Sequence, residues 1–148
     1  MSTAVNLNIP NAPSIASEKT ARGISIGLWI AQILLALVFG FAGAMKIFTP
    51  IEELAKNAAW IKDSALLIRF IGTSELAGAL GMLLPSLTRI KPKLTSLAAV
   101  GLFIIMVLAT GFHLVQGEAK VIPMTIILGA LAAFVAWGRG RKAVIASR

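Results

Sequence analysis

The segment RFIGTSELAGALGMLLP, residues 69–85, is apolar along most of its length but carries a carboxylate, Glu75, near its centre. About 20 residues of this character cross the ~30 Å hydrocarbon core of a bilayer, so the segment is typical of a transmembrane helix. An ionised group at mid-bilayer is costly, and it normally faces the protein interior, pairs with another group or stays protonated. The rest of the fold must therefore shelter Glu75.

Four apolar runs of about spanning length occur in the chain, at residues 24–45, 65–84, 94–115 and 121–138. The 148 residues are 57% hydrophobic and only 14% charged. A soluble four-helix bundle is the alternative, but it would need polar faces that recur about every 3.6 residues, and the run LFIIMVLATGF at 102–112 has none. We therefore expect an all-α fold, a transmembrane four-helix bundle over residues 24–138.

The net charge of +8 is concentrated in three parts of the chain. Residues 1–23, 86–93 and 139–148 hold nine basic residues and one acid, whereas the remainder holds five of each. Four spans put those three parts on one side of the membrane, and the positive-inside rule makes that side cytoplasmic. We expect a flexible cytoplasmic tail at 1–23, a basic cytoplasmic tail at 139–148 and contact with the lipid bilayer, and no nucleic-acid partner.

A short helix is predicted between the first two spans, over residues 50–61. Thr49 is placed as its cap, Pro50 suits the first helical position, and Glu52 and Lys56 could pair four residues apart. Apolar residues recur at helical spacing on the other side, so this helix should lie flat on the membrane surface. The second span is expected to end at Pro85.

Small residues surround Glu75 on its side of the predicted helix. Gly72, Gly78 and Ala79 stand at positions −3, +3 and +4 from the carboxylate. Residues three and four apart share a helix face, and small residues allow a neighbouring helix to approach closely. The face that carries Glu75 should therefore pack against another span rather than lipid.

Three basic or imidazole side chains are candidate partners for Glu75. Lys46 ends the first span and His113 lies near the outer end of the third, so both could reach the carboxylate from neighbouring helices. Arg69 is six residues from Glu75, which turns it by about 120° around the helix and disfavours a direct salt bridge within the second span. We predict a polar cluster of Glu75, His113, Lys46 and Arg69, and we expect Gln32 to hydrogen-bond between helices at the other end.

Composition excludes several chemistries. The chain has no cysteine and a single histidine, so it cannot build a disulfide, an iron–sulfur cluster, a Cys-ligated metal or a bis-His haem site by itself. We predict no metal site, no catalytic residue and no self-contained redox centre. Whether the protein has enzymatic activity is left open.

Three segments resemble the DoxX-like family of small four-span bacterial membrane proteins. They are FAGAMK (41–46), IGTSELAGALGMLLP (71–85) and MVLATGFH (106–113), and the resemblance extends over about residues 27–137. Its strongest marks are Gly72, Glu75, Gly78, Pro85 and His113. The founding members are membrane subunits linked to sulfur-compound oxidation that feeds electrons to quinone, so the resemblance implies the bacterial cytoplasmic membrane as the location.

The resemblance implies an accessory subunit of a membrane redox system, in which Glu75 and His113 form a polar intramembrane pocket that could hydrogen-bond a quinone head group. A redox partner protein or a homo-oligomer would then complete the system, because the chain carries no redox centre. Two alternatives remain open at this stage. One is a membrane assembly or chaperone-like protein whose polar cluster only fixes the bundle, and the other is a small proton-linked carrier that uses Glu75 as a protonation switch.

Overall fold

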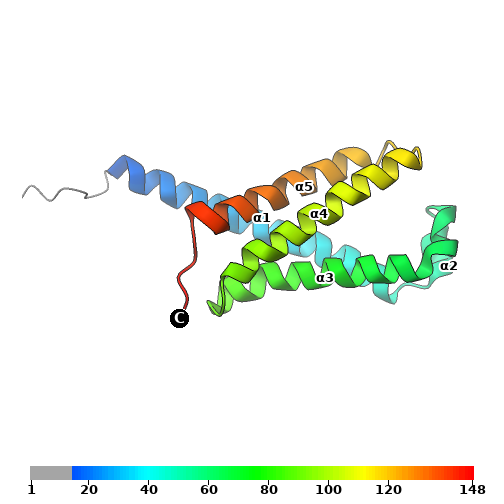
Figure 1. Cartoon of the computed structure of the whole chain (residues 1–148), viewed down its shortest axis with the longest axis horizontal. Coiled ribbons are helices and arrows are strands. Elements are labelled where there is room, and N and C mark those ends of the chain that lie inside the picture. The colour runs from blue at the N-terminus through cyan, green and yellow to red at the C-terminus, as the bar shows by residue number, and fades with distance from the viewer. Residues whose placement is uncertain (1–14) are drawn as a thin grey trace, which may run out of the picture.

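The computed structural model describes residues 15–148, and this part of the chain is helical without any strand. In chain order the elements are α1 Ile15–Phe48, α2 Ile51–Ala55, η1 Ala59–Ser64, α3 Ala65–Thr88, α4 Lys93–Val115, α5 Ile122–Trp137 and η2 Gly138–Lys142. Elements α1, α3, α4 and α5 run along the long axis of the molecule (Figure 1). The predicted all-α four-helix bundle is confirmed.

The four long helices form a ring in which each one packs on two neighbours. Helix α1 packs mainly on α3 and α4 mainly on α5, while α3 also contacts α4 and α1 also contacts α5. In Figure 1 the four helices converge on the left, and α4 and α5 slope away from α3 toward the right. Within residues 15–148, four segments are long and apolar enough to cross a membrane, namely Glu18–Phe48, Ala59–Thr88, Lys93–Val115 and Ile122–Lys142.

The core of the ring is apolar and its outer surface is apolar as well. Fully buried large side chains come from all four long helices, and they include Leu28, Leu35, Phe39, Met82, Leu102 and Val135. Many equally large apolar residues point outward, such as Leu37, Phe41, Leu66, Leu97 and Leu108, each more than half exposed. A soluble monomer rarely exposes so continuous an apolar surface, whereas lipid covers it without cost.

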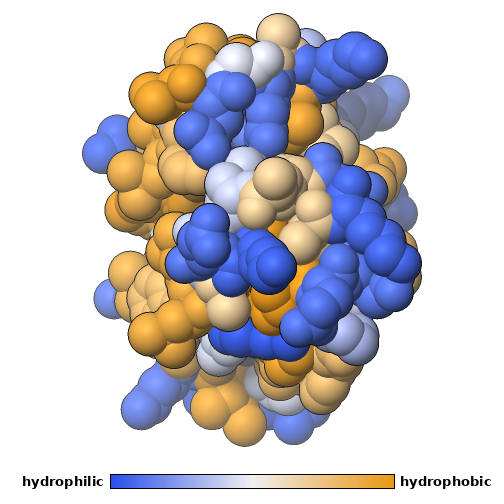
Figure 2. Space-filling model, turned by 90° about the vertical axis from the view of Figure 1, so that its right-hand side faces the viewer, coloured by the Kyte–Doolittle hydropathy of each residue, from blue (hydrophilic) through white to orange (hydrophobic). Residues whose placement is uncertain are grey.

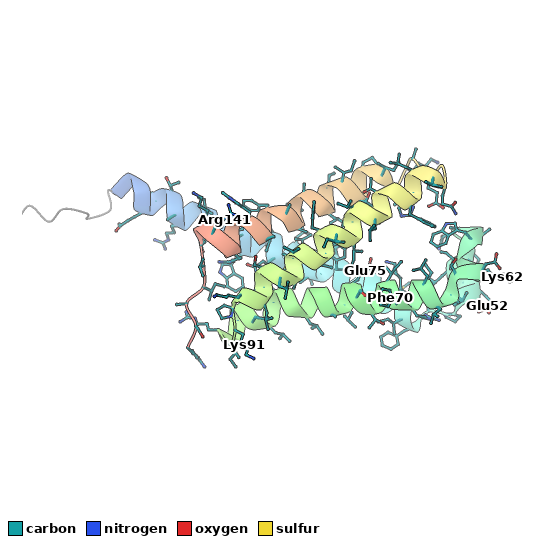
Figure 3. The ribbon with its side chains drawn as sticks, viewed as in Figure 1. Glu52, Lys62, Phe70, Glu75, Lys91 and Arg141 are labelled. Carbon is teal, nitrogen blue, oxygen red and sulfur yellow. The ribbon has the colours of Figure 1, made fainter. Side chains whose placement is uncertain are left out.

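The two ends of the bundle differ in charge. We call the end with residues 89–93 and 139–142 the basic end, and the end with residues 46–64 and 116–121 the mixed-charge end. Figure 3 shows Lys91 and Arg141 toward the basic end and Glu52 and Lys62 at the mixed-charge end, with Glu75 between them. Figure 2 looks onto the mixed-charge end, where hydrophilic residues gather across the tip of the bundle.

Two helix boundaries differ from the predicted ones. Helix α1 begins at Ile15, nine residues before the predicted start of the span, so residues 15–23 of the predicted flexible tail are helical and residues 1–14 lie outside the described part. Helix α3 does not end at Pro85 but continues to Thr88 with the proline inside it. Proline lacks one backbone N–H and therefore strains a helix, but a single one is tolerated in a membrane span.

The predicted helix over residues 50–61 is broken into two pieces, α2 and η1. Pro50 occupies the N-cap position rather than the first helical one, and no side chain caps α2. The Thr49 hydroxyl instead lies 3.7 Å from the Met45 sulfur. Lys56 pairs with Glu53 at 2.7 Å rather than with Glu52.

Candidate functional site

Two glycines bring α1 and α3 into close contact in the half of the bundle nearer the mixed-charge end. A Cβ on Gly43 would lie 2.6 Å from the carbonyl oxygen of Gly72, and a Cβ on Gly72 would lie 2.6 Å from the Cβ of Lys46. Real Cβ contacts are longer than this, so both positions need glycine. The expected packing of a small-residue face against other spans is thus found: Gly72 faces α1, and Gly78 faces α4, where its Cβ would lie 2.6 Å from Leu102 Cδ2.

This close contact places Lys46 beside Glu75. The Lys46 Nζ lies 2.7 Å from the Glu75 Oε2 and donates a hydrogen bond to it. Only 4% of the Glu75 side chain is exposed, whereas 28% of the Lys46 side chain is exposed. Glu75 is about 15 Å along α3 from Ala65, which agrees with its place midway along the bundle in Figure 3. The structure therefore pairs Glu75 with a cation, as the sequence predicted.

Arg69 belongs to the same site through the backbone of α1. Its Nη1 donates hydrogen bonds to the carbonyl oxygens of Lys46 and Ile47 in the last turn of that helix. Those carbonyls lack intrahelical partners, so Arg69 satisfies them and holds the end of α1 against α3. No ion pair joins Arg69 to Glu75 within residues 15–148. Arg69 positions Lys46 and does not contact the carboxylate.

His113 is engaged elsewhere. Its Nδ1 lies 2.6 Å from the Oε2 of Glu118, and the other carboxylate oxygen of Glu118 accepts a hydrogen bond of 3.0 Å from the Trp60 indole. Trp60 also meets Phe112 edge-on, with ring centroids 4.6 Å apart. The predicted contact of His113 with Glu75 is not among the interactions of the described residues. The sequence analysis missed Glu118, although an acid five residues after a histidine was a usable signal.

The Trp60–Glu118–His113 cluster links the segment between the first two spans to the α4–α5 loop. Hydrogen bonds from Trp60 first, and then from His113, hold the pKa of the Glu118 carboxyl below its ordinary value. A carboxylate that accepts two hydrogen bonds is stabilised in its charged form. This cluster therefore joins η1 to α4 at the mixed-charge end, where α4 and α5 slope away from α3 in Figure 1.

A second polar cluster lies at the basic end and draws on α1, α3, α4 and η2. Gln32 of α1 donates 3.0 Å hydrogen bonds to the Met82 carbonyl and the Ser86 hydroxyl of α3, and it accepts one from Arg139 Nε. The Ser86 hydroxyl lies 2.8 Å from that of Thr95 in α4. The interhelical role expected of Gln32 is confirmed. The sequence analysis missed Arg139, because an arginine just after a span is normally a surface anchor.

No group of three or more His, Cys, Asp or Glu side chains within residues 15–148 is arranged to hold a metal ion. The mid-membrane site consists instead of an ammonium and a carboxylate. Such a pair can donate and accept hydrogen bonds and can exchange a proton. It has no group that accepts or stores electrons.

The sequence was compared with known protein families, curated proteins and solved structures. It matches the DoxX-like family over residues 30–135, which is more than half of the chain. The chain belongs to the DoxX-like family. Together with the four spanning helices, this membership makes it a DoxX-like integral membrane protein. No curated protein and no solved structure matched the chain. The DoxX-like match includes Lys46, Arg69, Glu75 and His113, whereas Arg139 lies outside it.

Proposed function

We propose that this DoxX-like protein is a non-catalytic accessory subunit of a membrane redox system, and that its mid-membrane site binds a quinone head group. The observation that carries the proposal is the Lys46–Glu75 pair. Its carboxylate is almost fully buried halfway along a membrane-spanning helix. Ionisable groups at this depth are expensive and mark functional sites by default. The family membership supports a membrane setting for the activity.

The donor set at this site fits the acceptor chemistry of a quinone. The Lys46 ammonium carries three N–H donors and gives one to Glu75, so two donors are left for a ligand, and the side chain is partly exposed. A quinone carbonyl oxygen is a hydrogen-bond acceptor, so Lys46 would orient it. Glu75 is next to that donor and could hold or release a proton. When bound, a quinone takes up two electrons and two protons, and the electrons must come from a partner protein.

This proposal assigns a smaller part to His113 than the sequence suggested. Its Nδ1 already faces Glu118, so Lys46 supplies the donor that His113 was expected to supply. Arg69 holds the end of α1 and thereby the Lys46 stem. The site residues thus divide into a binding pair, Lys46 and Glu75, and two groups that position the surrounding helices.

An assembly protein without ligand chemistry is the second candidate, and one observation favours it. Glu75 is 3% exposed and the glycine contact beside it leaves no space for a side chain. In that reading the ion pair only locks α1 to α3. Nothing described in the site favours the third reading, a proton-linked carrier.

Purification with native lipids, followed by extraction and quantification of bound quinone, separates these functions. We expect quinone in the wild-type protein, loss of it in Glu75→Gln and Lys46→Met with the bundle still folded, and retention in His113→Ala. Glu53→Gln is the matched control, since its ion pair with Lys56 is exposed. Absence of quinone from the wild-type protein would refute the proposal that quinone is the ligand. Proton flux in vesicles that Glu75→Gln abolishes would favour a carrier.

We also propose that the protein resides in the bacterial cytoplasmic membrane with both termini cytoplasmic. The basic end supports this orientation, because cytoplasmic loops carry the excess of Lys and Arg. The chain has no cysteine, so single-cysteine variants can report the topology directly. We expect a membrane-impermeant maleimide to label Asn57→Cys in intact cells and Ser147→Cys only after lysis. The reverse pattern would overturn the orientation.

A further inference from the structure

A cavity of about 380 Å³ lies at the basic end, away from the Lys46–Glu75 pair. Its walls come from α1, the end of α3, η2 and residues 143–145. The polar side chains that line it are those of Ser25, Ser86, Arg89 and Arg139, and Trp29 lines it too. The Arg148 amide donates a hydrogen bond of 3.2 Å to the Arg89 carbonyl, which holds the C-terminal residues across this end. Cavities of this size accommodate small ligands.

Arg139 is a buried cation in the wall of this cavity. The residue is only 5% exposed, because Gly138 lets the chain pass against Leu28 with no room for a Cβ. Its Nε donates to Gln32, its Nη1 donates to the Ala143 carbonyl at 3.3 Å, and its Cζ lies 4.9 Å from the Trp29 ring centroid. Its Nη2 is buried and has no hydrogen-bond partner within the described residues.

The charge of Arg139 is not compensated by any acid of the described chain. The ion pairs within residues 15–148 are Lys46–Glu75, Lys56–Glu53 and His113–Glu118, and none of them is at the basic end. A buried cation without a counter-anion is strongly destabilising, and a buried donor without an acceptor adds to that cost. The cavity also carries Arg89, a second cation. An anion bound in the cavity would compensate the charges of both arginines.

We propose that this cavity binds a phosphate group, and that the phosphate belongs to the head group of an anionic phospholipid. A phosphate accepts several hydrogen bonds at once, which matches two guanidinium groups and the Ser25 hydroxyl around one space. The basic end of the bundle is where lipid head groups meet the protein, and basic pockets between spanning helices take such head groups. Leu87, Val144 and Ile145 give the cavity an apolar wall, which suits the first part of the lipid's acyl chains.

Most residues of this cavity lie outside the matched part of the chain, residues 30–135. Ser25, Trp29, Arg139 and residues 143–145 all fall beyond it. The inference therefore rests on this chain's own ends and is independent of the proposed quinone site. Variants at the two sites should not affect each other's ligand.

Native mass spectrometry of the purified full-length protein, titrated with phosphatidylglycerol or with zwitterionic phosphatidylcholine, tests the proposal. We expect one phosphatidylglycerol molecule to bind at least about tenfold more tightly than phosphatidylcholine, because both lipids offer a phosphate but Arg89 and Arg139 repel the choline cation of phosphatidylcholine. Arg89→Gln should weaken that binding about tenfold. Arg141→Gln is the matched control: it removes one exposed cation from the same end but does not line the cavity.

A thermal-shift arm separates a lipid from a free phosphate. Inorganic phosphate added to the protein in a neutral detergent should raise the melting temperature less than phosphatidylglycerol does, and an equal or larger rise would assign the site to soluble phosphate. Arg139→Gln should lose the lipid-induced shift while the protein still folds, because glutamine keeps a donor toward Gln32. Equal binding of both lipids, or equal weakening by Arg89→Gln and Arg141→Gln, would overturn the proposal.

Discussion

Replacement of Gly72 by alanine probes the contact on which the mid-membrane site depends. The added Cβ would lie 2.6 Å from the Lys46 Cβ and 2.9 Å from the Gly43 carbonyl oxygen. Carbon atoms prefer to be about 3.5–4.0 Å apart, so α1 and α3 must separate by roughly 1 Å. Overpacking of this kind costs about 1–3 kcal/mol, and the better helix propensity of alanine returns at most about 1 kcal/mol. We expect Gly72→Ala to lower the free energy of unfolding by about 1–2 kcal/mol.

The control for this variant is Gly101→Ala in α4. A Cβ on Gly101 meets nothing within 4 Å, so only the helix propensity changes and the stability should stay equal or rise slightly. Equilibrium unfolding in mixed micelles, followed by tryptophan fluorescence, gives both values. If Gly72→Ala is as stable as Gly101→Ala, the helices are not in close contact there, and the shelter that we describe for Glu75 does not exist.

Three further predictions concern single polar groups. Glu75→Gln leaves Lys46 without its anion and should lower the free energy of unfolding by about 2 kcal/mol. This is less than for a fully buried pair, because Lys46 is partly exposed. The double variant Glu75→Leu with Lys46→Met should recover most of that stability in the same unfolding assay. The pKa of Glu118 is lowered in the folded protein, so its contribution to stability is present at neutral pH and is lost as the pH falls through that lowered pKa. Glu118→Gln should therefore flatten the acid side of a plot of melting temperature against pH. An unchanged plot would contradict the hydrogen bond to Trp60. Gln32→Leu removes partners from both α3 and η2 and should destabilise the protein by about 2–3 kcal/mol, whereas a neutral effect would show that the buried network is dispensable.

The sequence predicted which segments span the membrane, but it did not predict where the helices end or how the segment between the first two spans folds. Length and hydropathy fix which segments cross the membrane, since hydrocarbon thickness sets one scale for all of them. Proline at position 85 was a misleading signal, because a membrane span tolerates a missing backbone hydrogen bond that ends most soluble helices. The predicted helix over residues 50–61 failed for another reason: local spacing does not tell where a short helix breaks.

For the mid-membrane cluster, the sequence pointed to a carboxylate that is buried in the structure and to one of its contacts. Small residues around Glu75 indicated which face must be covered, and Lys46 was the cation at the end of the preceding span. The sequence could not show whether Lys46 or His113 contacts Glu75, because the rotation of each helix about its own axis is set by packing across the whole ring. The same limit hid Arg139, whose inward direction depends on the Gly138–Leu28 contact between α1 and η2.

The turn between α3 and α4 contains two residues with left-handed backbone conformations, Arg89 at φ 58° and Lys91 at φ 47°. A residue other than glycine loses roughly 1–2 kcal/mol in that conformation. Glycine at either position would relieve the strain but would delete a cation from the connection between two spans. The left-handed turn thus favours glycine at these two positions, whereas the charge difference between the two ends of the bundle favours basic residues. The sequence has the basic residues. Those charges can act on the nascent chain during membrane insertion, before any turn exists to be strained.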